Sequence, residues 1–130
     1  MYTNDEILKT TKLLMRYNEH ALNRFEQAKT SGVKGDFYTE VKPFADEVKQ
    51  TTSVWKIAVL SWIKSHQQRN LHSKQIESTA ENLEMVSIQA FFPETSRKRF
   101  IGHIQSIEYV LKSLHEALEE SIKNATKAEQ

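Results

Sequence analysis

Apolar side chains recur every three or four residues along most of this chain, which is the spacing of helices that bury one face. The most regular series has intervals that alternate between four and three residues, as in helices packed at coiled-coil geometry. Its members are Phe37, Val41, Phe44, Val48, Thr51, Trp55, Ala58 and Trp62. We therefore predict a central helix over residues 37–66, with Trp55 and Trp62 buried against neighbouring helices.

The same periodicity predicts three further helices, over residues 4–28, 73–92 and 96–124. Thr3, followed three residues later by Glu6, forms a capping box in front of the first helix. The third helix is expected to stop at Phe92, because a proline disfavours helical geometry in the residue before it. The residues after 124 have no apolar anchor, so we expect this tail to fray.

Four amphipathic helices with short connections predict an all-α fold, an up-down-up-down antiparallel four-helix bundle. We expect one domain over residues 1–130, since this length lies in the commonest size range of domains. Pro43 falls within the central helix, on the side that faces away from the core. Because proline removes a backbone hydrogen bond and crowds the preceding turn, we predict a proline-kinked second helix.

Composition narrows the functional classes. The chain has no cysteine, which excludes disulfides and thiolate metal sites. Its 18 basic and 17 acidic side chains give a net charge of +1, so the overall charge does not favour a nucleic-acid partner. The most apolar run, residues 54–63, is too short to span a bilayer, and the first residues do not resemble a signal peptide. We therefore expect a cytoplasmic protein without a membrane partner.

Several short strings of residues, scattered over nearly the whole chain, resemble those of a known family. They are Asp36-Phe37-Tyr38, Val41-Lys42-Pro43, Trp55, His72, Gln75-Ile76, Gln89, Lys98-Arg99-Phe100, Ser106 and Tyr109. In these positions the chain is similar to the YppE-like proteins, small helical bundles from Bacillus and its relatives. The resemblance implies the bundle and a cytoplasmic setting in a Gram-positive bacterium. That family has no known function, so the resemblance carries over no catalytic residue.

The sequence contains no recognisable catalytic or metal-binding motif. A ferritin-like di-iron site needs Glu-x-x-His on two helices, and none of the five histidines has a glutamate three residues before it. No two histidines lie three or four residues apart, as a zinc pair on one helix requires. Nucleophile motifs and glycine-rich phosphate loops are also absent. We predict no catalytic residue, cofactor or metal and therefore not an enzyme. The alternative is an enzyme or cofactor carrier with a site in the bundle core.

Thr11, Asn18 and His66 are polar residues at apolar positions of the helices. Asn18 lies within the inner stripe of the first helix, where a buried amide hydrogen-bonded to a facing helix is favoured over a ligand role. His66 lies at the end of the central series, where packing and hydrogen bonding are favoured over metal or haem ligation.

The antiparallel arrangement brings five basic residues to one end of the bundle. They are Lys29, Lys34, Arg97, Lys98 and Arg99. Together with exposed amides at helix N-termini they are a candidate anion-binding patch, whereas a solvated surface is the simpler interpretation. Basic residues at a helix N-terminus also oppose the helix dipole, which favours a compensating anion.

A second apolar stripe on the third helix, formed by Met85, Ile88 and Phe92, is rotated away from the main one. Ile57 and Leu60 are displaced in the same way on the central helix. These side chains either widen the core or form an exposed surface for a partner helix or a second copy of the chain. The pattern as a whole favours a non-enzymatic interaction or adaptor protein with an unknown partner, and the alternative is a binder of phosphate-rich ligands or nucleic acid.

Overall fold

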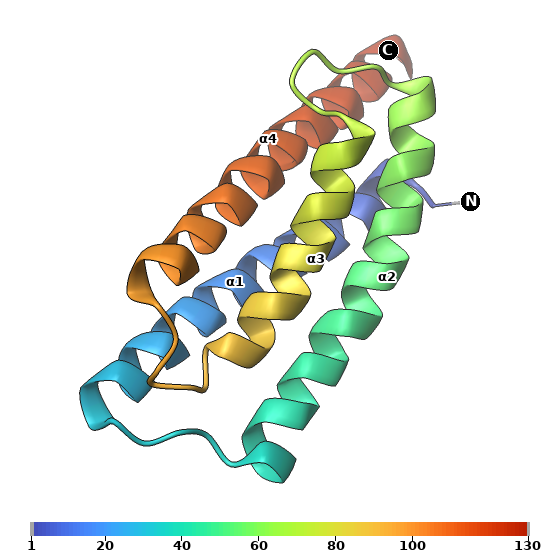
Figure 1. Ribbon diagram of the computed structural model, residues 1–130. Coiled ribbons are helices and arrows are strands. Elements are labelled where there is room, and N and C mark those ends of the chain that lie inside the picture. The colour runs from blue at the N-terminus through green and yellow to red at the C-terminus, as the bar shows by residue number, and fades with distance from the viewer. Residues whose placement is uncertain (1, 130) are drawn as a thin grey trace.

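The computed structural model describes residues 2–129, in which four long helices form an antiparallel bundle (Figure 1). The helices are α1 (Asn4–Ser31), α2 (Lys42–Ser65), α3 (Ser73–Gln89) and α4 (Arg97–Glu129), and a π-helical turn, η1 (Phe37–Val41), precedes α2. Successive helices run in opposite directions. Helix α1 packs against α2 and α4, and α3 packs against the same two. The predicted up-down-up-down bundle is confirmed.

Local signals set the ends of the first helix. Thr3 Oγ1 accepts a hydrogen bond from the backbone amide of Glu6 at 3.1 Å, which satisfies one of the free amides of the first turn. Gly32 ends the helix in the left-handed conformation, with φ of 71°, and its amide donates to the carbonyl of Ala28. A side chain at this position would be strained, so glycine fixes where α1 stops.

Aromatic side chains fill much of the core. Trp55 and Trp62 are 0% and 5% exposed, which confirms that both are buried. Phe25 of α1 stacks on Phe100 of α4 with ring centroids 4.1 Å apart. Burial of one large apolar side chain stabilises a fold by about 1.5–3 kcal/mol, so these rings contribute much of the packing between the helices.

Asn18 and His66 both contact neighbouring groups. Asn18 is buried and donates from Nδ2 to the carbonyl of Ile104 on α4 at 3.1 Å, as predicted for a facing helix. The ring of His66 stacks on Trp62 at 4.7 Å, and its Nδ1 lies 3.0 Å from the Ser65 hydroxyl. His66 is thus packed and hydrogen-bonded at the end of α2.

The predicted irregularity at Pro43 takes the form of a π-helical turn at the start of α2. Proline has no amide to donate to the turn before it, and the chain there uses the wider bonds from Val41 to Asp36 and from Lys42 to Phe37. Because this turn is wider than an α-helical one, Phe37 lies off the face formed by the other residues of the buried series. Phe37 is 54% exposed, so its predicted place in the buried series was wrong.

Two predicted helix ends also require correction. Helix α3 ends at Gln89, short of Phe92, and turn-like hydrogen bonds carry the chain through residues 90–92. Helix α4 continues to Glu129, where the sequence predicted a frayed tail after residue 124. The side chains of residues 123–128 are exposed, so this extension rests on backbone hydrogen bonds without core packing.

Candidate functional site

The lower end of the bundle in Figure 1 holds the segments 32–36 and 90–96, and we call it the loop end. The two segments are joined by a hydrogen bond of 2.8 Å from the amide of Gly35 to the carbonyl of Phe91. A Cβ atom at Gly35 would lie 2.7 Å from Cδ1 of Phe91, so only glycine permits this approach. The connection between α1 and α2 is therefore fixed against the end of α3.

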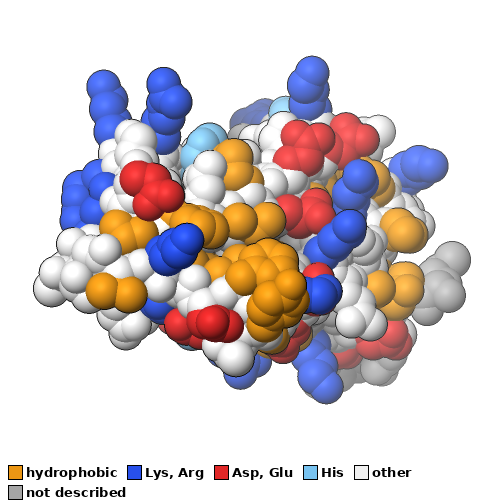
Figure 2. Space-filling view, turned by 60° about the horizontal axis from the view of Figure 1, so that its bottom comes forward, with side chains coloured by type: hydrophobic (Ala, Val, Ile, Leu, Met, Phe, Trp, Pro, Cys, Tyr) orange, Lys and Arg blue, Asp and Glu red, His pale blue; other side chains and the backbone are white. Residues whose placement is uncertain are grey.

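Three large apolar side chains are exposed at the loop end, and we call them the aromatic surface. They are Val33, Phe37 and Tyr38, which are 64%, 54% and 79% exposed. The rings of Phe37 and Tyr38 meet edge to face, with centroids 5.1 Å apart. Figure 2 brings this end of the molecule forward and shows hydrophobic side chains gathered between basic and acidic ones. Such grouping of exposed aromatic residues is typical of protein interaction sites.

Asp36 holds the backbone that carries the two aromatic rings. Its carboxylate accepts hydrogen bonds from the amide and the hydroxyl of Thr39, both at 2.9 Å. These hydrogen bonds lower the pKa of Asp36 below its ordinary value, because they stabilise the ionised carboxylate. An ordered cap thus presents Phe37 and Tyr38 in one conformation, which reduces the entropy lost when a partner binds.

Two ion pairs at this end tie α4 and η1 to α1. Arg97 donates to both carboxylate oxygens of Glu26, at 2.6 and 3.2 Å. Arg24 donates to Glu40 at 3.0 Å. Each arginine lowers the pKa of its partner glutamate, and the bond to Glu26 raises the pKa of Arg97. The Arg97–Glu26 pair is exposed on both sides, so it defines geometry more than it adds stability, whereas the Arg24 side chain is only 13% exposed.

The five predicted anion-patch residues all lie at the loop end, but their contacts differ. Lys29 and Arg97 both lie over the ring of Phe25, at 5.5 and 5.4 Å from its centroid. The charge of Arg97 is already paired with Glu26. Lys34, Lys98 and Arg99 are exposed and make no ion pair within residues 2–129.

The predicted interaction stripe on α3 is only partly exposed. Ile88 is 46% exposed, whereas Met85 and Phe92 are half-buried and Phe92 packs against the core. On α2, Ile57 is exposed and Leu60 packs against the core. A role of this stripe in binding stays a prediction. Each side chain of the aromatic surface is more exposed than Ile88, the most exposed member of the stripe.

Within residues 2–129 the structure shows no group of three or more His, Asp or Glu side chains placed to hold a metal ion. None of the helices described is both long and apolar enough to cross a bilayer.

The aromatic surface was missed in the sequence because Phe37 fitted the buried series. Two features of the sequence do mark it. Tyr38 follows Phe37 directly, and adjacent residues of a helix point about 100° apart, so a narrow buried face does not hold two neighbouring large rings at its centre. Pro43 lies shortly afterwards, where an interruption of helical geometry changes the phase of the residues before it.

Comparison with known proteins identifies relatives of the same fold. A family model for a bacterial domain of unknown function, DUF1798, matches residues 11–118. The uncharacterised protein YppE of Bacillus subtilis is 24% identical over 112 residues, which are 86% of this chain and 91% of that protein. The predicted resemblance to YppE-like proteins is confirmed.

Solved structures extend the comparison. The crystal structure of Bacillus subtilis YppE superposes with a TM-score of 0.89 at 22% identity, covering 94% of this chain and 99% of that one. A Listeria innocua protein of unknown function gives 0.87 at 25% identity, covering 92% and 96%. A DUF1798 protein from Staphylococcus aureus gives 0.83 at 23% identity, covering 90% and 99%. These similarities establish the fold and assign no activity.

Proposed function

This chain belongs to the DUF1798 family of bacterial domains of unknown function, and from that premise we propose that it is a non-enzymatic interaction module that binds a partner protein through its loop end. The observation that carries the proposal is the aromatic surface. Phe37 and Tyr38 are both more than half exposed, although their backbone is held by an ordered cap. Grouped exposed aromatic side chains are typical of binding surfaces.

The charges around the aromatic surface indicate the chemistry of the partner. Lys34 lies next to Val33 in the chain, and Lys98 and Arg99 lie at the same end without ion pairs among the described residues. A partner segment with apolar side chains flanked by acidic residues complements both features. Aromatic residues at the centre of such contacts usually supply much of the binding free energy.

The test uses paired variants of exposed aromatic residues. Phe37→Ser with Tyr38→Ser removes the aromatic surface, and Tyr109→Ser is the control, because Tyr109 is 59% exposed on α4. Partners are recovered from an extract of the source bacterium, identified, and then measured as purified proteins. We expect the double variant to bind about 30-fold more weakly or worse, the loss typical of a hot spot.

Two results would overturn the proposal. One is a purified partner that binds the double variant as tightly as the unaltered chain. The other is an equal loss of affinity in the Tyr109→Ser control, which would show a general effect of lost apolar surface.

A second candidate function is binding of a phosphate-rich ligand by the basic side chains of the loop end. The observation in its favour is that Lys98 and Arg99 stand unpaired, within the described residues, in the first turn of α4. Retention on an immobilised polyphosphate should then fall steeply with salt and be lost on Lys98→Gln with Arg99→Gln. The control is Lys112→Gln with Lys123→Gln, which removes the same charge elsewhere on α4.

A further inference from the structure

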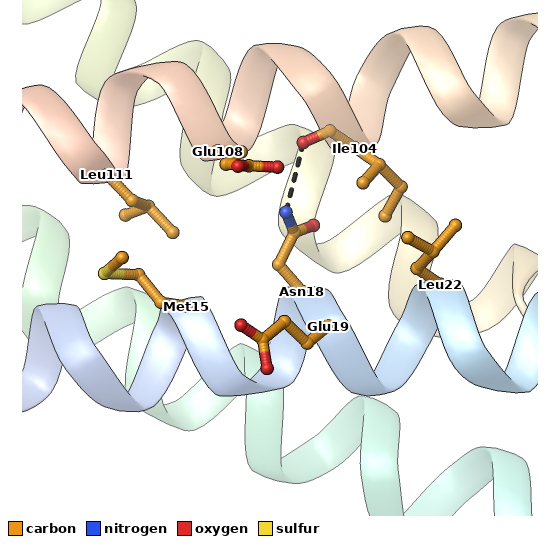
Figure 3. A pocket seen from close by; sticks show the side chains of 7 residues that line it. All are labelled: Met15, Asn18, Glu19, Leu22, Ile104, Glu108 and Leu111. Atoms are coloured by element: carbon orange, nitrogen blue, oxygen red, sulfur yellow. Dashed lines mark hydrogen bonds between the residues drawn. The ribbon is translucent and has the colours of Figure 1, made fainter.

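The contact between α1 and α4 contains a pocket of about 100 Å³ (Figure 3). Its apolar walls are formed by Met15, Leu22, Ile104 and Leu111. A space of this size has room for several water molecules or for a short alkyl chain. The polar side chains that line it decide between these occupants.

The amide oxygen of Asn18 is an unsatisfied acceptor at this pocket. Asn18 is 4% exposed, and while its Nδ2 donates to Ile104, its Oδ1 has no partner among the described residues. Figure 3 shows this oxygen directed toward the space between Ile104 and Leu22. A buried acceptor left unpaired costs about 1–3 kcal/mol, so a donor that reaches it gains binding free energy.

Two carboxylates lie at the same pocket, one from each helix. Glu19 of α1 and Glu108 of α4 line it beside Asn18. Both residues are exposed, and neither makes an ion pair with a basic residue in the part of the chain that the structure describes. The free polar atoms of the pocket are therefore one buried neutral oxygen and two negative groups, all of them acceptors.

We propose that this pocket binds a primary alkylammonium group. Its N–H donates to Oδ1 of Asn18, and its positive charge is compensated by Glu19 and Glu108. The attached carbon chain lies against the apolar walls. The same chemistry is offered by a small free amine and by a lysine side chain, and the experiment below separates these sources. The site lies apart from the loop end and goes beyond the proposed function.

Other ligand classes fit the lining less well. A carboxylate or phosphate would face only acceptors and two like charges. A neutral alcohol would satisfy Asn18 but leave both glutamates uncompensated. A divalent cation such as Ca²⁺ requires six or more oxygen ligands, whereas the pocket offers one amide and two carboxylates.

The binding test uses the purified chain and nuclear magnetic resonance titration with n-butylammonium. We expect saturable shifts of the Asn18 side-chain amide and of the backbone amides lining the pocket. Neutral 1-butanol should bind about tenfold more weakly or worse, and butyrate should not bind, because a charge-assisted hydrogen bond is lost. N-acetyl-lysine methylamide is titrated in parallel, and the tighter of the two amines identifies the source.

Two sets of variants then assign the residues. Glu19→Gln with Glu108→Gln should weaken n-butylammonium binding about tenfold or more, whereas the control Glu116→Gln with Glu120→Gln removes the same charge outside the pocket and should change it less than about twofold. Asn18→Leu removes the acceptor and fills the space, so binding should be lost. If that variant does not fold, the glutamate pair still decides the question.

The proposal is overturned if n-butylammonium gives no saturable shifts at the pocket, which would leave water as its only occupant. It is also overturned if 1-butanol binds equally well, or if both glutamate pairs lose affinity to the same extent. Because no partner protein is present in this experiment, a negative result leaves the proposal for the loop end intact.

Discussion

The indole nitrogen of Trp55 donates a hydrogen bond to the hydroxyl of Thr11, across 3.1 Å between α2 and α1. Both residues are 0% exposed. The Thr11 hydroxyl in turn donates to the carbonyl of Ile7, one turn earlier in α1, at 2.7 Å. Indole, hydroxyl and carbonyl thus form a chain in which each buried donor has an acceptor, which explains a threonine in the apolar stripe of α1.

Thr11→Val should destabilise the bundle by about 1–3 kcal/mol, because valine keeps the shape of threonine but leaves the buried indole N–H without an acceptor. The free energy of unfolding in urea measures this cost. In a Trp55→Phe background the same substitution should cost less, since phenylalanine has no donor to satisfy. An equal cost in both backgrounds would show that the hydrogen bond contributes little.

Two glycines should respond to alanine in opposite directions. Gly35→Ala places a Cβ atom 2.7 Å from Phe91, whose ring is buried and cannot move aside, and should destabilise by about 1–3 kcal/mol. Gly102→Ala is the control, because no atom lies within 4 Å of the added Cβ in α4 and alanine favours helix by about 0.5–1 kcal/mol. Thermal unfolding of both variants measures the difference. Similar melting temperatures would contradict the close approach of the two loop segments.

The carboxylates of the loop end should make stability depend on pH in one direction. Glu26, Asp36 and Glu40 all have a pKa lowered from ordinary values of 3.8 for Asp and 4.5 for Glu. Because the pKa of each carboxyl is lower in the folded state, the ionised carboxylate stabilises the fold. This stabilisation is complete above the ordinary pKa and is lost as the pH falls through the folded pKa. Stability should therefore decrease on acidification below these values.

Urea unfolding at neutral pH and at about pH 3 measures this dependence, since the titration of ordinary carboxyls falls between them. Glu26→Gln with Glu40→Gln removes two of the hydrogen-bonded carboxylates and should flatten the change with pH. The pair Glu116→Gln and Glu120→Gln, exposed on α4, should not. An undiminished pH dependence in the first pair would place its cause elsewhere.

Much of the fold follows from the sequence because long amphipathic helices bury residues in a strict period. That period places Trp55 and Trp62 in the core and Asn18 on the α1 face that meets α4. The period fails at Phe37, where the wider turn before Pro43 changes the phase. A pattern of spacing assumes one helical geometry throughout, and so it cannot show where that geometry changes.

The candidate sites were less predictable than the fold. The sequence places Lys29 and Arg97 at one end, but the ion pair of Arg97 with Glu26 depends on how α4 docks on α1. The unpaired oxygen of Asn18 likewise appears only when the facing helix is in place, since its nitrogen alone reaches Ile104. Both features depend on how α1 and α4 pack against each other, and the spacing of residues along one helix does not determine this packing.

Stability measurements can show which residues of the predicted stripe Met85, Ile88 and Phe92 pack in the core and which are exposed. Phe92 is half-buried against the core, so Phe92→Gln should cost about 1–3 kcal/mol, whereas Ile88→Gln, at a side chain 46% exposed, should stay within about 0.5 kcal/mol. In a chain of this length 1 kcal/mol lowers the melting temperature by about 3–5 °C, so thermal unfolding resolves the difference. If both variants melt like the unaltered chain, Phe92 is free to serve a partner and the stripe is a surface. If only Ile88→Gln does, the stripe belongs mainly to the core, and the loop end is left as the larger apolar surface for binding.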